Sequence, residues 1–285
     1  MRVLVVLNLS LILIFQATIA SAQITGSAAP SSPQLSEVVL TSAHSFVLRD
    51  PKTQVGYRIY VALPQGYDGG TKSYTVLFLL DADNAFALAA QAYRLLRVDS
   101  TTPDLLLVGI GYDLTGAARR TRRERDLTPT RLAANPDTGD AGAFLTFLAD
   151  TIIPTIDARY RTLPTDRGLF GHSIGGLFAL YALVDRPDVF RRYIVSSPSL
   201  WWDGAVILQH ERRFSQNRTA LPRSIFMSVG SEEPADMLEF FKPFADALKS
   251  RGYASLQFET AVLPSERHFT AFSAAFLRGL RVVYR

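Results

Sequence analysis

The feature that most constrains this chain is the sequence GHSIGG at residues 171–176. An apolar run at residues 167–170 precedes it, and a run rich in alanine and leucine follows it at residues 177–184. A G-x-S-x-G sequence between a strand pattern and a helix pattern predicts a sharp turn that projects the serine from the top of a sheet. Glycines permit the unusual backbone angles and the close packing of such a turn. Ser173 is therefore the predicted nucleophile.

Continuous apolar runs alternate with helical patterns over most of the chain. Further strand patterns occupy residues 74–80, 104–109, 167–171, 192–196, 224–229 and 255–263. Helical patterns occupy residues 84–96, 143–158, 174–184, 235–249 and 272–283. Runs without polar alternation are typical of parallel strands covered on both faces. Together with an antiparallel N-terminal pair at residues 37–48 and 54–63, they predict a mostly parallel, doubly wound α/β sheet of about eight strands.

The N-terminal segment has the pattern of a secretory signal peptide over residues 1–22. One arginine precedes a long apolar run at residues 3–19, and small residues follow at a typical cleavage position. We expect cleavage after Ala22, a periplasmic or secreted protein, and no membrane span after cleavage; the alternative is an uncleaved anchor. Residues 23–34 then predict a flexible tether, and residues 35–285 a single α/β domain.

Composition excludes several classes of site. The chain has no cysteine, which excludes a thiol nucleophile, disulfide bonds and a cysteine-rich metal site. Its four histidines show no ligand spacing, so neither a metal nor an organic cofactor is expected. Thirty Lys and Arg against 26 Asp and Glu make the chain only mildly basic, and we expect no nucleic-acid partner.

A long segment at residues 112–141 interrupts the alternation and predicts a functional loop. Five arginines fall within seven of its positions, and a stretch rich in Pro, Asp and Gly follows them. The segment follows a strand, so it lies on the same edge as Ser173, where ligands of open α/β sheets bind. Arg125 and its neighbours either bind an anionic ligand or pair with acids such as Asp126 or Asp113.

A serine nucleophile needs a base and an acid that orients the base. In this architecture the acid and then the histidine base follow the serine along the chain. This order leaves His210 and His268 as candidates for the base. We predict His268, because it follows the last strand pattern, whereas His210 lies in an arginine-flanked stretch typical of a solvated helix face. The acid is expected after the strand at residues 224–229, where Glu233 is preferred to two alternatives. The alternatives are Glu232 and Asp236, with a dyad lacking an acid as a further possibility.

The oxyanion of an acyl-transfer reaction needs two backbone donors. The first expected donor is the N–H of Ile174. The second belongs to the segment 81–83, where we predict the N–H of Ala82. Asp81 and Asp83 are also expected to cap the helix that begins near Asn84.

Four motifs resemble the Putative esterase branch of the α/β-hydrolase superfamily, which includes periplasmic siderophore esterases of the enterobactin type. They are LLD at residues 79–81, RDLTP at 125–129, GHSIGG at 171–176 and SPSLWW at 197–202. The resemblance extends from about residue 38 to the C-terminus. It implies an α/β-hydrolase fold, with Ser173 as nucleophile, His268 as base, and Trp201 and Trp202 lining or supporting the acyl pocket. The family usually has glycine where this chain has Ala82.

These observations predict an exported serine esterase that acts through an acyl-enzyme on a small-molecule ester or lactone. A siderophore lactone is the first substrate that we expect, followed by polysaccharide-linked or small aryl esters. An acyltransferase would use the same residues, since only the group that resolves the acyl-enzyme differs. A binding protein that kept the fold without catalysis is the remaining alternative.

Overall fold

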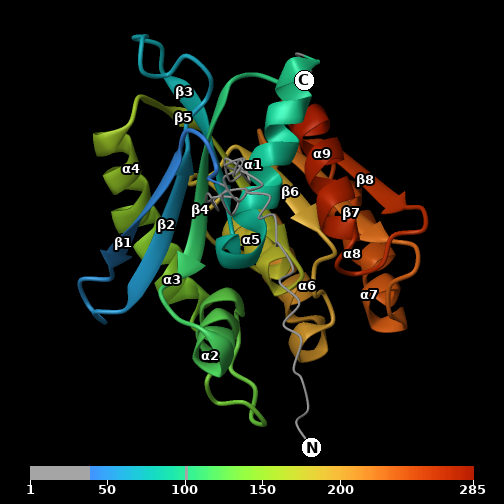
Figure 1. Cartoon of the computed structure of the whole chain (residues 1–285). Coiled ribbons are helices and arrows are strands. Elements are labelled where there is room, and N and C mark those ends of the chain that lie inside the picture. The colour runs from blue at the N-terminus through green and yellow to red at the C-terminus, as the bar shows by residue number, and fades with distance from the viewer. Residues whose placement is uncertain (1–38, 100–101) are drawn as a thin grey trace, which may run out of the picture. The chain divides into compact units, whose positions relative to one another are not determined.

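The computed structural model describes residues 39–99 and 102–285, so the predicted signal peptide and tether lie outside the described residues. Leu40–Arg285 forms one compact unit. Its centre is an eight-stranded sheet in the order β1-β2-β4-β3-β5-β6-β7-β8 (Figure 1). The strands are β1 (Ala43–Arg49), β2 (Gly56–Ala62), β3 (Tyr74–Leu79), β4 (Leu105–Tyr112), β5 (Thr162–His172), β6 (Arg192–Ser196), β7 (Ser224–Gly230) and β8 (Gln257–Leu263).

The sheet is antiparallel at one edge and parallel elsewhere. β2 pairs antiparallel with both β1 and β4, and every other neighbouring pair is parallel. The predicted fold class, including the antiparallel N-terminal pair, is therefore confirmed. Because parallel strands end at the same edge, the loops after β5, β6, β7 and β8 meet along one rim of the sheet.

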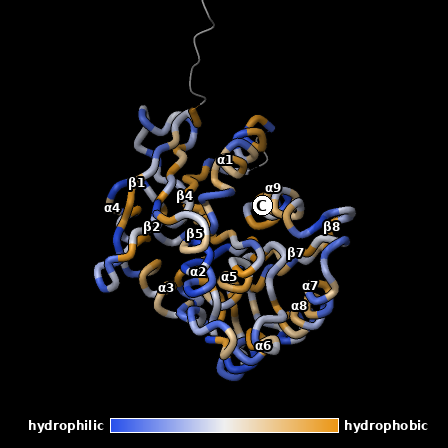
Figure 2. The backbone as a smooth tube through the Cα atoms, turned by 60° about the horizontal axis from the view of Figure 1, so that its bottom comes forward, coloured by the Kyte–Doolittle hydropathy of each residue, from blue (hydrophilic) through white to orange (hydrophobic). Residues whose placement is uncertain are grey.

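Helices cover both faces of the sheet. They are α1 (Ala82–Val98), α2 (Gly116–Leu127), α3 (Ala141–Phe147), α4 (Ile153–Arg159), α5 (Ile174–Asp185), α6 (Trp202–Ser215), α7 (Ala235–Glu239), α8 (Phe241–Ser250) and α9 (Ala271–Val283). Side chains of β3 alternate between the two layers: Phe78 joins the core with α5, and Leu79 joins the core with α1 and α9. Figure 2 shows hydrophobic residues along α5 and hydrophilic ones along α2.

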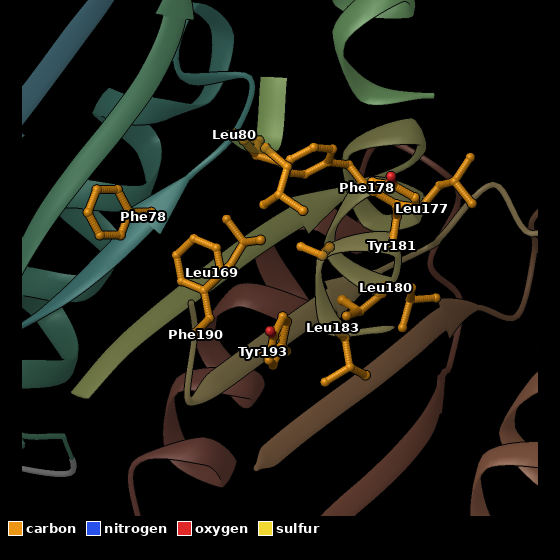
Figure 3. Close-up of a cluster of buried hydrophobic side chains, with 14 of the residues drawn as sticks. Phe78, Leu80, Leu169, Leu177, Phe178, Leu180, Tyr181, Leu183, Phe190 and Tyr193 are labelled. Atoms are coloured by element: carbon orange, nitrogen blue, oxygen red, sulfur yellow. The ribbon is translucent and has the colours of Figure 1, made fainter. Parts of the chain in front are cut away.

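The larger core lies between the sheet and α5. Phe178 and Leu180 of α5 are fully buried, and they pack with Leu169 of β5, Phe190 and Tyr193 (Figure 3). Burying a side chain of this size stabilises a fold by roughly 1.5–3 kcal/mol. The helix that follows Ser173 is therefore rigidly held.

One helical run among the described residues is long and apolar enough to cross a membrane by length and composition alone. It spans Ala141–Arg159 and consists of α3, a π-helical turn (Leu148–Ile152) and α4. Phe144, Leu145 and Ile156 of this run are buried in the core of the unit. Its apolar character is thus explained by packing against the sheet.

The structure differs from the expected secondary structure at several elements. A helix was expected only around residues 209–213 where α6 lies, and the helix expected at residues 143–158 is interrupted by the π-helical turn. The predicted loop at residues 112–141 contains α2, a 12-residue helix in which only Asp126 and Leu127 are buried. It lacks the apolar periodicity on which the prediction depended, because seven of its 12 residues are charged. The single helix expected at residues 235–249 is two helices, α7 and α8, which meet at Phe240.

Candidate active site

Ser173 lies at the turn between β5 and α5 with a strained backbone. Its φ of 61° and ψ of −125° are rarely adopted by a residue with a side chain. A Cβ at Gly171 would lie 2.0 Å from the carbonyl oxygen of Gly175, and one at Gly176 would lie 3.0 Å from the Cα of Pro198. Close backbone approach therefore requires glycine at residues 171 and 176.

Three of the predicted site residues meet at this turn. Ser173 Oγ lies 3.0 Å from His268 Nε2, and His268 Nδ1 lies 2.8 Å from Glu233 Oε2. His268 is in the loop between β8 and α9, and Glu233 is in the loop between β7 and α7. A neutral imidazole that carries its proton on Nδ1 donates to the carboxylate and accepts the serine O–H. This arrangement allows the imidazole to take a proton from the serine.

Glu233 is buried and accepts hydrogen bonds from three groups. Besides His268, the hydroxyl of Ser197 and the backbone N–H of Gly230 (2.8 Å) donate to its carboxylate. Burial raises the pKa of Glu233, but the bonds from His268, Ser197 and Gly230 together outweigh burial and hold that pKa below its usual range. The group is therefore ionised at neutral pH.

The alternative acid and base candidates are engaged elsewhere. The ring of His210 on α6 packs edge-on against Tyr181, with 5.4 Å between ring centroids. Glu232 forms an ion pair with Arg267 at 3.3 Å. The carboxylate of Asp236 accepts the backbone N–H of the next residue at 3.0 Å. Of the three carboxylates considered, Glu233 is the one that contacts His268.

The loop after β6 contributes two buried serines to which sequence analysis gave no role. Ser197, with a φ of 46°, donates its hydroxyl to Glu233. The N–H of Ser199 donates to the carbonyl oxygen of Ser173 at 3.1 Å, and the two Oγ atoms lie 3.5 Å apart. The position of these serines, directly after the strand beside β5, is the sequence signal that could have identified them.

Two helices, α5 and α1, begin near Ser173. Ile174 and Ala82 are their first residues, so no carbonyl of the same helix accepts their N–H groups. A Cβ at Gly175 would lie 3.2 Å from Asp81 Oδ2, so the start of α1 adjoins the first turn of α5. Asp81 has a positive φ (58°) and Ala82 does not, so an alanine fits at this position without backbone strain.

The prediction that Asp81 and Asp83 cap α1 was wrong, because other elements hold both carboxylates. Asp81, the residue before the helix, makes no side-chain cap bond. It accepts two hydrogen bonds from Arg123 of α2, at 2.5 and 2.7 Å. Asp83 accepts the hydroxyl of Tyr60 at 3.0 Å and the backbone N–H of Tyr112 at 2.7 Å. Arg123 therefore anchors the loop that presents Ala82.

A second histidine, His172, lies against His268. Their ring centroids are 4.7 Å apart, and His172 Nδ1 lies 3.0 Å from Ser196 Oγ. Burial, followed by the proximity of His268, lowers the pKa of His172 to about 3. His172 is therefore neutral at physiological pH and adds no positive charge beside His268.

The predicted substrate-binding residues lie in different surroundings. Arg125 pairs at 2.6 Å with Asp126, whose side chain is fully buried, which is one of the two arrangements expected for it. Trp201 is 36% exposed, whereas Trp202 is buried and donates its indole N–H toward Thr130. Trp201 therefore has aromatic surface available to a ligand, and Trp202 packs against it with 5.9 Å between ring centroids.

A polar hollow of about 530 Å³ lies beside the start of α1. Its lining includes Arg58, Tyr60, Asp83, Tyr112, Asp113 and Arg119. These side chains offer both donors and acceptors next to the segment that presents Ala82. Among the residues that the structure describes, no group of three or more His, Asp and Glu side chains is arranged to hold a metal ion.

A mostly parallel eight-stranded sheet, with a serine on a strained turn from a central strand to a buried helix, defines an α/β-hydrolase fold. The sequence profile of the Putative esterase family matches residues 51–282. The chain therefore belongs to this family.

Individual relatives agree with this assignment. The chain is 33% identical over 205 residues to a siderophore triacetylfusarinine C esterase of Aspergillus fumigatus, covering 69% of this chain and 70% of the relative. It is 28% identical over 246 residues to the ferri-bacillibactin esterase BesA of Bacillus subtilis, covering 79% and 83%. The crystal structure of BES protein from Bacillus cereus has the same fold, with a TM-score of 0.81, 24% identity, and coverage of 90% and 99%. The predicted resemblance to siderophore esterases is confirmed.

Proposed function

We propose that this protein is an exported serine esterase that cleaves carboxylic ester bonds through an acyl-enzyme. The observation that carries the proposal is the continuous contact from Ser173 to His268 to Glu233, at 3.0 and 2.8 Å. Membership of an esterase family supports ester hydrolysis as the reaction. The signal-peptide pattern of residues 1–22 supports export.

The proposed reaction has two halves that use the same groups. In acylation, Ser173 Oγ attacks the ester carbonyl while its proton moves to His268 Nε2, which then protonates the leaving alcohol. In deacylation, water takes the place of the alcohol, and His268 removes and returns a proton again. Glu233 stabilises the imidazolium, and the N–H groups of Ile174 and Ala82 stabilise the oxyanion.

We further propose that the substrate is an ester or lactone of a siderophore. Two relatives are named as siderophore esterases, and this chain covers more than two thirds of the length of each. The hollow beside the start of α1 offers polar groups, and Trp201 offers a partly exposed aromatic face; each could contact a part of such a ligand. The side chain of Arg125 is 27% exposed, so part of it can reach a ligand, and its role in substrate binding stays a prediction.

The first test compares hydrolysis of a short p-nitrophenyl ester by the mature protein and by Ser173→Ala, together with fluorophosphonate labelling. We expect turnover and labelling by the wild type and neither by Ser173→Ala. Ser250→Ala, at the exposed end of α8, is the matched control and should behave as the wild type. A folded wild type that neither labels nor hydrolyses contradicts the proposal.

The substrate class is tested separately by product analysis. The enzyme is incubated with a trilactone siderophore, with and without iron, and the products are resolved by mass spectrometry. We expect stepwise addition of one water per ester bond, abolished in Ser173→Ala. Turnover of p-nitrophenyl esters without any lactone cleavage would keep the esterase assignment and reject the siderophore. Transfer of the acyl group to an added alcohol, in preference to water, would indicate an acyltransferase.

A further inference from the structure

A second serine hydroxyl, that of Ser199, lies beside the proposed nucleophile. Ser199 Oγ lies 3.5 Å from Ser173 Oγ, and Ser199 is 2% exposed. Its backbone N–H already ties the loop to the carbonyl oxygen of Ser173 at 3.1 Å. The position of the loop is therefore fixed by the main chain, and the Ser199 hydroxyl is an additional polar group directed at the reacting oxygen.

The direction of the hydrogen bonds follows from the groups around them. Glu233 is ionised and can only accept, so a neutral His268 carries its proton on Nδ1 and accepts at Nε2. Ser173 therefore donates its own proton to His268, at 3.0 Å. The oxygen of Ser173 has lone pairs left to accept, and Ser199 is then the donor in the contact between the two hydroxyls.

We propose that Ser199 is a further catalytic residue whose hydroxyl donates to Ser173 Oγ and stabilises the negative charge that develops on this oxygen. The inference rests on the proposed function, because it requires Ser173 to be the nucleophile. A hydrogen bond to a charged oxygen is stronger than one to a neutral hydroxyl. A contact of 3.5 Å in the free enzyme shortens when charge appears on the acceptor, as is common for catalytic hydrogen bonds.

The same donor acts in both halves of the reaction. During acylation the O–H bond of Ser173 breaks, its proton passes to His268 Nε2, and the oxygen is electron-rich until the new C–O bond forms. During deacylation water adds to the acyl carbon and gives a proton to His268; the C–O bond to Ser173 then breaks, its electron pair returns to Ser173 Oγ, and His268 gives this oxygen the proton. Ser199 keeps its own proton throughout, so it stabilises the oxygen without acting as an acid.

The loop after β6 thus contacts two members of the proposed catalytic chain through different serines. Ser197 donates to Glu233, and Ser199 donates to Ser173. Pro198 lies between them, and its Cα packs closely on Gly176 of α5. The nucleophile and the acid are consequently positioned by a single short segment.

The test compares Ser199→Ala and Ser199→Thr with the wild type, with every rate normalised to the sites titrated by a fluorophosphonate. Losing a donor to developing charge should lower kcat by about 10- to 100-fold and slow single-turnover acylation and deacylation alike. KM should change by less than about threefold, because the interaction strengthens only in the transition state. Ser199→Thr keeps a hydroxyl and should recover at least part of the rate.

Two results would overturn the role of Ser199. One is a normalised kcat of Ser199→Ala within about twofold of the wild type, and the other is an equal loss in the alanine and threonine variants. Neither result affects the proposed function, provided that Ser173→Ala is inactive. Activity retained by Ser173→Ala would instead remove the nucleophile and the inference with it. Ser250→Ala again controls for a serine-to-alanine change outside the site.

Discussion

α5 and α2 are helices of equal length at the same rim of the sheet, but opposite interactions hold them in place. Each has 12 residues. α5 buries every residue from Ile174 to Val184, whereas α2 buries only its last two, and Figure 2 shows the same contrast in hydropathy. The helix behind the nucleophile is fixed by the core, and the helix beside Ala82 is fixed by ion pairs. The first should be sensitive to loss of buried volume, and the second to loss of the charges that form its ion pairs.

The largest effect is expected at the turn that α5 supports. Replacing the proposed base, as in His268→Gln, should lower kcat by about 10⁴- to 10⁶-fold, because Ser173 loses the group that takes its proton. The side chain is 23% exposed, so the fold should survive. Ester turnover measures the loss, and far-UV circular dichroism checks folding. A decrease below about 100-fold would show that another group serves as base.

The next effect tests the core beneath that turn. Phe178→Ala removes a fully buried ring from α5 and should lower the free energy of unfolding by about 3–5 kcal/mol. Arg120→Ala, on the exposed face of α2, should change it by less than about 0.5 kcal/mol. Urea unfolding of both variants measures the difference. Similar losses in the two helices would invalidate the contrast between them.

The same contrast decides how much of the fold could be predicted from the sequence. α5 and the parallel strands were predicted because continuous burial leaves continuous apolar runs. α2 was expected to be part of a loop because it has no apolar periodicity, and the acid that pairs with Arg123 is Asp81, 42 positions away in the sequence. Pattern analysis detects burial along an element, but it does not detect the acid on another element that neutralises a given arginine.

The candidate site divides in a similar way. Ser173 and His268 followed from a motif and from the order of elements, and Glu233 was preferred because of its place after a strand. Ser197 and Ser199 received no role, because their position after a strand places them near the site but does not show which side chains they contact. Only the structure brings their loop against Glu233 and Ser173.

A smaller effect is expected from the ion pair that joins α2 to α1. Arg123→Leu leaves Asp81, whose side chain is 17% exposed, without its two-point donor. The free energy of unfolding should fall by about 1–3 kcal/mol, and kcat by about tenfold, because Ala82 loses its fixed position. In a double-mutant cycle, Asp81→Asn should add little to Arg123→Leu. Additive losses would show that the two side chains act independently.

The smallest effect concerns two buried carboxylates. Glu233 contacts the proposed base beside α5, and Asp126 lies on α2. Hydrogen bonds hold the pKa of Glu233 down against burial, whereas burial raises the pKa of Asp126 on α2 despite its contacts with Arg125 and Tyr57. Folding therefore favours the ionised form of Glu233 and the protonated form of Asp126. The two groups should affect stability in opposite directions as pH changes.

This opposition can be measured with Glu233→Gln and Asp126→Asn, unfolded in urea between pH 3 and pH 7. The stabilisation from Glu233 is present above its ordinary pKa and is lost as pH falls through the lowered value, so Glu233→Gln should approach the wild type in acid. The stabilisation linked to Asp126 is present below its ordinary pKa and is lost as pH rises through the raised value. Asp126→Asn should therefore gain on the wild type as pH rises. The sign of each change with pH, opposite in the two variants, is the quantity that the experiment measures. If the stability curves of both variants run parallel to that of the wild type, neither carboxylate changes its pKa on folding. The electrostatic contrast between the two sides of the site would then be absent.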